Sequence, residues 1–127
     1  MTIRRGRHLV VLIMLTGSSI LSSAQSQFAG HWQSKSGRTG KPAFTVNIDL
    51  AQDTIKGTMI LVDPSNGREI ESEITNAESH GTILEFTTKV HNDTFEWRLT
   101  LKDKRHGLLH GSTGEMLIDE QVVKRQT

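Results

Sequence analysis

The sequence predicts an all-β domain: an eight-stranded antiparallel meander closed into a small up-and-down barrel. Apolar and polar residues alternate with a period of two through much of the chain after residue 24, and short turn-rich segments separate these runs. No stretch keeps apolar residues at helical spacing for long enough to predict a helix. Because the links are short, each strand is expected to pair with its sequence neighbour, and closure would remove the exposed edges of such a meander.

Strict alternation marks three of the expected strands. Residues 44–50 and 95–101 alternate without error, and residues 69–74 place three glutamates on one face and two isoleucines on the other. The first strand opens at Gly30. Four further strands are predicted from runs rich in apolar and β-branched residues, at 55–62, 83–90, 108–112 and 116–124.

The segments between the runs contain residues typical of turns. Residues 63–67 read Asp-Pro-Ser-Asn-Gly, in which Pro presets φ and Asn-Gly tolerates positive φ. Eight strands of about 6 to 9 residues with seven short links occupy about 100 residues, which matches the length after residue 24. Gly57 and Gly111 fall inside expected strands, where glycine is typical of a bulge or a sharp bend.

The first 24 residues predict a secretory signal peptide. Three arginines without an acid precede an apolar run, and Ser22-Ser23-Ala24 places small residues where signal peptidase cleaves. The apolar stretch, about 13 residues, is shorter than the roughly 20 that a membrane helix needs, although an uncleaved anchor is the alternative. We therefore expect a signal at 1–24, a barrel domain at 25–127, a secreted or periplasmic location, and no membrane span after cleavage.

Charge and cysteine content narrow the functional classes. Removal of the signal changes the formal net charge from +1 to about −2, so the basic character belongs to the targeting segment. A nucleic-acid-binding domain would show a basic face, so no nucleic-acid partner is expected. The chain has no Cys, so the exported domain has to fold without disulfides.

Gly30-His31-Trp32 resembles the Gly-x-Trp that opens the first strand of lipocalins and, in similar form, of avidins. In those families a basic residue from the last strand lies over the Trp ring at the closed end, a part that Arg125, or else Lys124, could take here. The resemblance implies a small calycin-like barrel with Gly30, Trp32 and Arg125 as its structural signature. The chain is shorter than a lipocalin and has no Tyr, so no ligand is carried over from either family.

Catalytic, phosphate and metal motifs are incomplete. The glycine loop at 34–42 has Lys35 where a P-loop needs Gly and Pro42 where it needs Ser or Thr. His106 and His110 are spaced as on a helix face but fall across a turn and a strand, with no Cys to complete a metal site. No Gly-x-Ser-x-Gly is present. We expect no enzyme activity, no cofactor and no metal.

The basic turn at 102–106 is expected to be a solvated hairpin tip, with contact to an anionic partner as the alternative. The barrel interior is the remaining candidate site. The inward faces of two strands are expected to line it with Phe44, Val46, Ile48, Leu50, Phe95, Trp97, Leu99 and Leu101. An eight-stranded barrel is either filled by side chains or just wide enough for one small ligand.

Two functional hypotheses follow. The first is a binding protein that holds an apolar small molecule at the barrel mouth. Its candidate ligand-binding residues are Trp32, Phe44, Val46, Ile48, Phe95, Trp97 and Leu99. The second is a packed barrel that binds another protein, as an interaction or inhibitor module in the cell envelope or outside it. A cavity of a few hundred Å³ around Phe95 and Trp97 would favour the first, and a filled interior would favour the second.

Overall fold

The computed structural model describes residues 25–36, 40–114 and 117–126. The predicted signal peptide at 1–24 lies outside these residues, as does part of the glycine loop, at 37–39. The described chain is all-β apart from a short helical turn at residues 25–28. Among these residues, no helix is long and apolar enough to cross a membrane.

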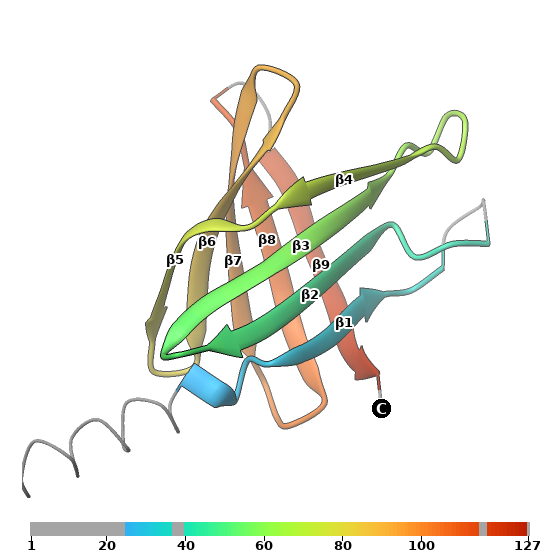
Figure 1. The fold of residues 1–127 in the computed structure, drawn as a ribbon. Coiled ribbons are helices and arrows are strands. Elements are labelled where there is room, and N and C mark those ends of the chain that lie inside the picture. Colours follow the sequence, from blue (N-terminus) through green and yellow to red (C-terminus); the bar gives the residue numbers. More distant parts are fainter. Residues whose placement is uncertain (1–24, 37–39, 115–116, 127) are drawn as a thin grey trace, which may run out of the picture.

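The described strands form one antiparallel sheet of nine (Figure 1). They are β1 (Gly30–Ser34), β2 (Phe44–Ala51), β3 (Thr54–Val62), β4 (Glu69–Glu73), β5 (Thr75–His80), β6 (Ile83–Val90), β7 (Asp93–Leu101), β8 (His106–Ser112) and β9 (Leu117–Gln126). Their order across the sheet is β4-β3-β2-β1-β9-β8-β7-β6-β5. Strands adjacent in sequence pair with each other, as expected, except β4 and β5.

The first and last strands of the described chain, β1 and β9, also pair with each other, which places Trp32 opposite Arg125. The link without pairing lies at the outer edges of the sheet. The outermost strands β4 and β5 are consecutive in the chain and meet at Ile74, whose N–H donates to the carbonyl of Gly57 at 2.9 Å. No ladder of hydrogen bonds joins β4 to β5, so within the described chain the sheet is not closed by hydrogen bonds.

The sheet is strongly coiled, so that its two halves face each other. Figure 1 shows β2, β3 and β4 crossing in front of β7, β8 and β9. The rings of Phe44 on β2 and Trp97 on β7 meet edge to face, with centroids 5.7 Å apart. Side chains from both halves therefore share one core, as expected for an all-β domain of this size.

The expected strand count of eight was too low by one. β5 was not predicted, because its sequence Thr-Asn-Ala-Glu-Ser-His contains one apolar residue and ends in residues typical of turns. It pairs with β6 through an irregular register between Thr75 and Glu78, where Asn76 has a φ of +52°. Pairing with a well-formed neighbour therefore overrides the weak local preference.

The inward faces expected for residues 44–50 and 95–101 are buried or partly buried. The buried hydrophobic residues of the core are Phe28, Trp32, Val46, Ile48, Met59, Ile74, Leu84, Phe86, Trp97, Leu99, Leu109 and Val123. Seven partly buried hydrophobic residues pack against it, namely Phe44, Ile55, Leu61, Ala77, Phe95, Leu101 and Ile118. Alternation thus assigned the core faces of these strands correctly.

The strand glycines lie where another group comes close. A Cβ at Gly111 would lie 2.4 Å from the Trp97 ring, and one at Gly57 would lie 1.9 Å from the carbonyl oxygen of Asn47. The register between β8 and β9 also shifts between Leu109 and Gly111, which confirms the bulge expected there. Glycine at these positions allows the tight curvature of the sheet.

Candidate functional site

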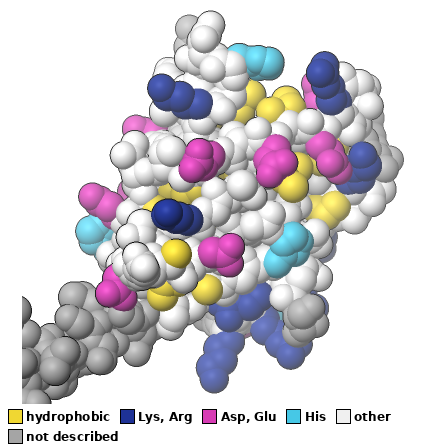
Figure 2. Space-filling model, in the orientation of Figure 1, with side chains coloured by type: hydrophobic (Ala, Val, Ile, Leu, Met, Phe, Trp, Pro, Cys, Tyr) yellow, Lys and Arg dark blue, Asp and Glu magenta, His cyan; other side chains and the backbone are white. Residues whose placement is uncertain are grey.

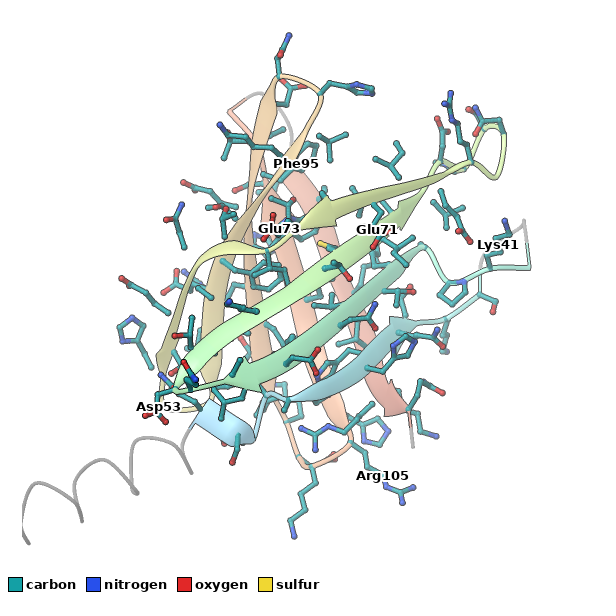
Figure 3. The ribbon with its side chains drawn as sticks, in the orientation of Figure 1. Lys41, Asp53, Glu71, Glu73, Phe95 and Arg105 are labelled. Carbon is teal, nitrogen blue, oxygen red and sulfur yellow. The ribbon has the colours of Figure 1, made fainter. Side chains whose placement is uncertain are left out.

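An aromatic cluster lies at one end of the core. Trp97 stacks on Phe95 with ring centroids 5.9 Å apart and an interplanar angle of 12°, and it meets Phe44 edge to face. Both phenylalanines are half-buried, whereas Trp97 is 2% exposed. Figure 3 shows Phe95 at the upper end of the molecule.

Two residues that were not predicted hold Trp97 in place. Its indole Nε1–H donates to the hydroxyl oxygen of Thr88 at 2.9 Å, and Thr88 is completely buried. Gly111 on β8 lies opposite Trp97 and leaves room for the indole. Thr88 shares a face of β6 with the buried Leu84 and Phe86, and this spacing of two residues was the signal in the sequence that could have placed its hydroxyl in the core.

A second tryptophan anchors the opposite end of the core. Trp32 is fully buried, and its Nε1–H donates to the carbonyl of Phe28 at 3.0 Å. The guanidinium carbon of Arg125 lies 4.6 Å from the ring centroid of Trp32, within cation–π range, and Arg125 also donates to the carbonyl of Gln27. Gly30 permits this contact, because a Cβ there would lie 3.3 Å from the Arg125 side chain at a φ of +141°.

The structure thus places the candidate ligand-binding residues in three parts of the core. Phe44, Phe95 and Trp97 form the aromatic cluster, while Trp32 lies under Arg125. The remaining candidates are buried core residues, namely Val46, Ile48 and Leu99. Of the two basic residues considered for the position over Trp32, Arg125 occupies it. The ligand-binding role of these residues stays a prediction.

Side chains fill the interior around Trp97. The two phenylalanine rings cover it on one side, and its ring lies too close to Gly111 to admit even an added Cβ. A ligand at this end would have to lie on the outer faces of Phe44 and Phe95, above Trp97. Close contact of this kind is typical of protein interiors, which are packed as densely as organic crystals.

A hollow of about 400 Å³ lies at the Trp32 end of the molecule. It is formed by the helical turn before β1, the β5–β6 turn and the β7–β8 turn. Its lining residues are Gln27, Thr82, Leu101, Lys102, Asp103, Lys104 and Arg125. Figure 3 shows Arg105, from the same β7–β8 turn, at the lower end of the molecule, opposite Phe95.

Two further hollows lie over neighbouring strands, one over β5, β6 and β7 and the other over β6, β7 and β8. They measure about 220 and 200 Å³, and both are bordered by Glu85, Glu96 and Trp97. Arg98 pairs with Glu85 at 3.6 Å in one of them, with both side chains about half exposed. Exposed ion pairs of this kind contribute little to stability or binding, so we assign no site there.

Asp103 organises the β7–β8 turn. Its carboxylate accepts the backbone N–H groups of Arg105 and His106, each at 2.8 Å, and lies 3.0 Å from the imidazole Nδ1 of His106. The backbone hydrogen bond from Arg105, followed by the His106 side chain, lowers the pKa of Asp103 below its ordinary value of 3.8. In the β3–β4 turn, hydrogen bonds from the Ser65 hydroxyl and N–H likewise lower the pKa of Asp63.

Metal-ligating side chains do not converge in the part of the chain that the structure describes. No group of three His, Asp or Glu residues there is placed to bind a metal ion. The His106 imidazole contacts the Asp103 carboxylate. His110 lies on the same face of β8, four residues farther along the strand, which corresponds to about 13 Å. The pair therefore does not form the adjacent ligands that the same spacing gives on a helix.

A scan of protein-family models finds no match for this chain, and searches of curated proteins and of solved structures find none with significant similarity.

Proposed function

We propose that this protein is an exported, non-catalytic binding module, a calycin-like barrel that takes an apolar small molecule at its Phe95 end. The observation that carries the proposal is the aromatic cluster. Phe44 and Phe95 are half-buried and rest on a Trp97 that is fixed by Thr88, so their outer faces form a rigid apolar surface. Rigid aromatic surfaces bind apolar groups with little loss of conformational entropy.

Two features support closure of the sheet into a barrel. The outer strands β4 and β5 are one continuous run of chain, so the two edges of the sheet are covalently joined at Ile74. Residues of β4 also approach β6, and residues of β3 approach β5, across the seam. In such a barrel the continuous segment of β4 and β5 forms both edges of the sheet, so no long edge is available for pairing with other molecules.

The ligand is expected to lie at the rim of the barrel. Figure 2 shows hydrophobic atoms exposed at the top of the molecule, between the two upper projections. Since side chains fill the space around Trp97, an alkyl or aromatic group would cover Phe44 and Phe95 from outside. Such shallow contact predicts weak binding, because little of the ligand surface is removed from water.

Export is supported by the order of basic, apolar and small residues at 1–24. The test is the mass of the protein recovered from its host's envelope or medium. We expect an amino terminus at Gln25. A protein that retains residues 1–24 in the membrane fraction would contradict the proposal of export and favour the anchor.

Binding is tested by NMR titration with decanol, a neutral amphiphile. The sequence has two tryptophans, so the indole N–H signal of Trp97 reports the Phe95 end and that of Trp32 reports the opposite end. We expect decanol to shift the Trp97 signal and the Phe95→Ala variant to lose most of that shift. The control is Leu117→Ala, which removes an exposed hydrophobic side chain (68%) outside the cluster. An unmoved Trp97 signal, or equal effects of both variants, would contradict the proposal.

A protein-interaction module is the second candidate function. It is favoured by the filled interior and by two large hydrophobic side chains exposed on β9, Leu117 at 68% and Val122 at 56%. Photo-crosslinking from position 122 in the native compartment tests it. A single discrete adduct would support this function. Crosslinks spread over many abundant proteins would count against it.

A further inference from the structure

The hollow at the lower end of the molecule combines an apolar wall with a cationic rim. Leu101 and the methylene stems of Lys102 and Lys104 provide apolar surface, while Thr82 and Gln27 provide polar groups at the side. Its volume of about 400 Å³ falls inside the range, roughly 300 to 1,000 Å³, of sites that bind small molecules. Figure 2 shows Lys and Arg side chains gathered at this end.

The positive charges around this hollow are not neutralised locally. Neither Lys102 nor Lys104 forms an ion pair with any side chain that the structure describes. Asp103 is the one acidic residue of the lining, and its side chain is 60% exposed. Its carboxylate accepts the backbone N–H groups of Arg105 and His106 and forms no ion pair with Lys102 or Lys104, so the lining keeps an excess of positive charge.

Arg125 adds a third cation that is fixed in position. Its guanidinium is held over Trp32 and donates to the carbonyl of Gln27, while its Nε–H is buried without an acceptor. No carboxylate among the described residues pairs with it. A fixed guanidinium in contact with an aromatic ring loses less entropy on binding an anion than a free one would.

We propose that this hollow is a second binding site, for a small anionic amphiphile: a molecule with a single acidic head group and an apolar body. The head group contacts Lys102, Lys104 and Arg125, and the body lies along Leu101. A long polyanion is disfavoured because residues 25–127 carry a formal charge of about −2, so the rest of the surface does not attract it. This proposal is independent of the apolar site at Phe95, which lies at the other end of the molecule.

The experiment compares decanoate, decanol and decylammonium, which share a chain and differ in head-group charge. Each is titrated into the purified, isotopically labelled protein while the two indole N–H signals are followed. Trp32 lies directly under Arg125, so we expect decanoate to shift the Trp32 signal and the other two to leave it unchanged at equal concentration. Added salt is expected to weaken the decanoate effect, since exposed charges are screened within about 10 Å at 0.1 M.

The variant Lys102→Gln/Lys104→Gln keeps the turn and Arg125 and removes two cations. Two exposed ion pairs together contribute about a fivefold change in affinity, so the variant is expected to bind decanoate about fivefold more weakly. The control is Lys89→Gln, which removes an exposed lysine from β6 near the opposite end. Circular dichroism of all variants confirms that the fold is kept.

The two indole signals separate the outcomes for the two sites. A decanoate-specific Trp32 shift that is weakened in the double variant and unchanged in Lys89→Gln supports the anion site. Equal Trp32 shifts with decanol and decanoate, or full binding by the double variant, overturn it. A response confined to Trp97 overturns the anion site and leaves the apolar site intact, whereas no response at either tryptophan overturns both.

Discussion

Replacement of Gly111 by Ala tests how tightly the core is filled around Trp97. The added Cβ would lie 2.4 and 2.5 Å from two carbons of the indole, about an ångström closer than the 3.4 Å at which ordinary contact begins. The indole cannot move freely, because its Nε1–H is bonded to Thr88 and its ring stacks on Phe95 and meets Phe44 edge to face. The clash therefore has to be relieved by displacement of β8 or of the ring.

Overpacking of this kind costs about 1 to 3 kcal/mol. We expect Gly111→Ala to lower the free energy of unfolding by about 2 kcal/mol, which corresponds to a fall in Tm of roughly 10 °C for a domain of this size. Urea denaturation gives the free energy, and the Trp97 indole signal shows whether the ring has moved. Gly114→Ala is the control, since a Cβ there meets no described atom within 4 Å. It reduces the entropy of the unfolded chain in the same way without a clash.

A double-mutant cycle identifies the cause. Trp97→Phe removes the outer carbons of the indole that the new Cβ would meet, so Gly111→Ala is expected to cost at least about 1 kcal/mol less in that background. Equal stability of Gly111→Ala and Gly114→Ala would refute the reasoning. So would an unchanged cost in the Trp97→Phe background, which would place the strain elsewhere in β8.

Three further outcomes are expected. Thr88→Val leaves the buried Trp97 N–H without an acceptor and lowers the free energy of unfolding by about 1 to 3 kcal/mol, measured by urea denaturation. Arg125→Met removes the cation over Trp32 and lowers it by about 1 kcal/mol, with a change in Trp32 fluorescence. The pKa of Asp103 lies below 3.8, so its turn stays ordered above that pH and loosens as pH falls through the lowered pKa, seen in the Arg105 amide shift.

Each of these expectations has its own control. Thr88→Ser keeps the hydroxyl and is expected to lose less stability than Thr88→Val, and a reversed order would contradict the buried hydrogen bond. Lys124→Met, next to Arg125 but exposed, is expected to stay within about 0.5 kcal/mol of the parent. An Arg105 amide that titrates at or above pH 3.8, or that titrates unchanged in Asp103→Ala, would remove Asp103 as the cause.

Alternation, together with runs of apolar and β-branched residues, predicted most strands of the sheet. It did so best for strands with one apolar face and one polar face. The strand expected at 83–90 from its apolar and β-branched residues has those bounds in β6. β5 was missed because Ala77 is its one apolar residue, and its pairing with β6 cannot be read from its own composition. The pattern of apolar residues along the sequence therefore predicts strands with one buried face. It does not predict a strand such as β5, which has few apolar residues and is held mainly by pairing with its neighbour.

The sites depend on contacts across strands, which the sequence alone does not specify. The basic turn at 102–106 was visible, but the hollow beside it also needs Gln27 and Thr82, which are distant in the chain. The packing of Gly111 against Trp97 likewise follows from the register of β7 and β8, which one residue of slippage would change completely. The sequence left open whether the interior is filled or hollow, and the close approach of Gly111 to the Trp97 ring shows tight packing at that point.

The pairing of β1 with β9 constrains the order in which the sheet can fold. Trp32 and Arg125 lie opposite each other although more than 90 residues separate them along the polypeptide. A growing chain can form the intervening hairpins early, but β1 has to wait for the carboxyl-terminal strand before its second side is satisfied. Such distant pairing slows folding. Loss of the last ten residues would consequently split the sheet at its middle, leaving β1 and β8 as two new unpaired edges prone to association.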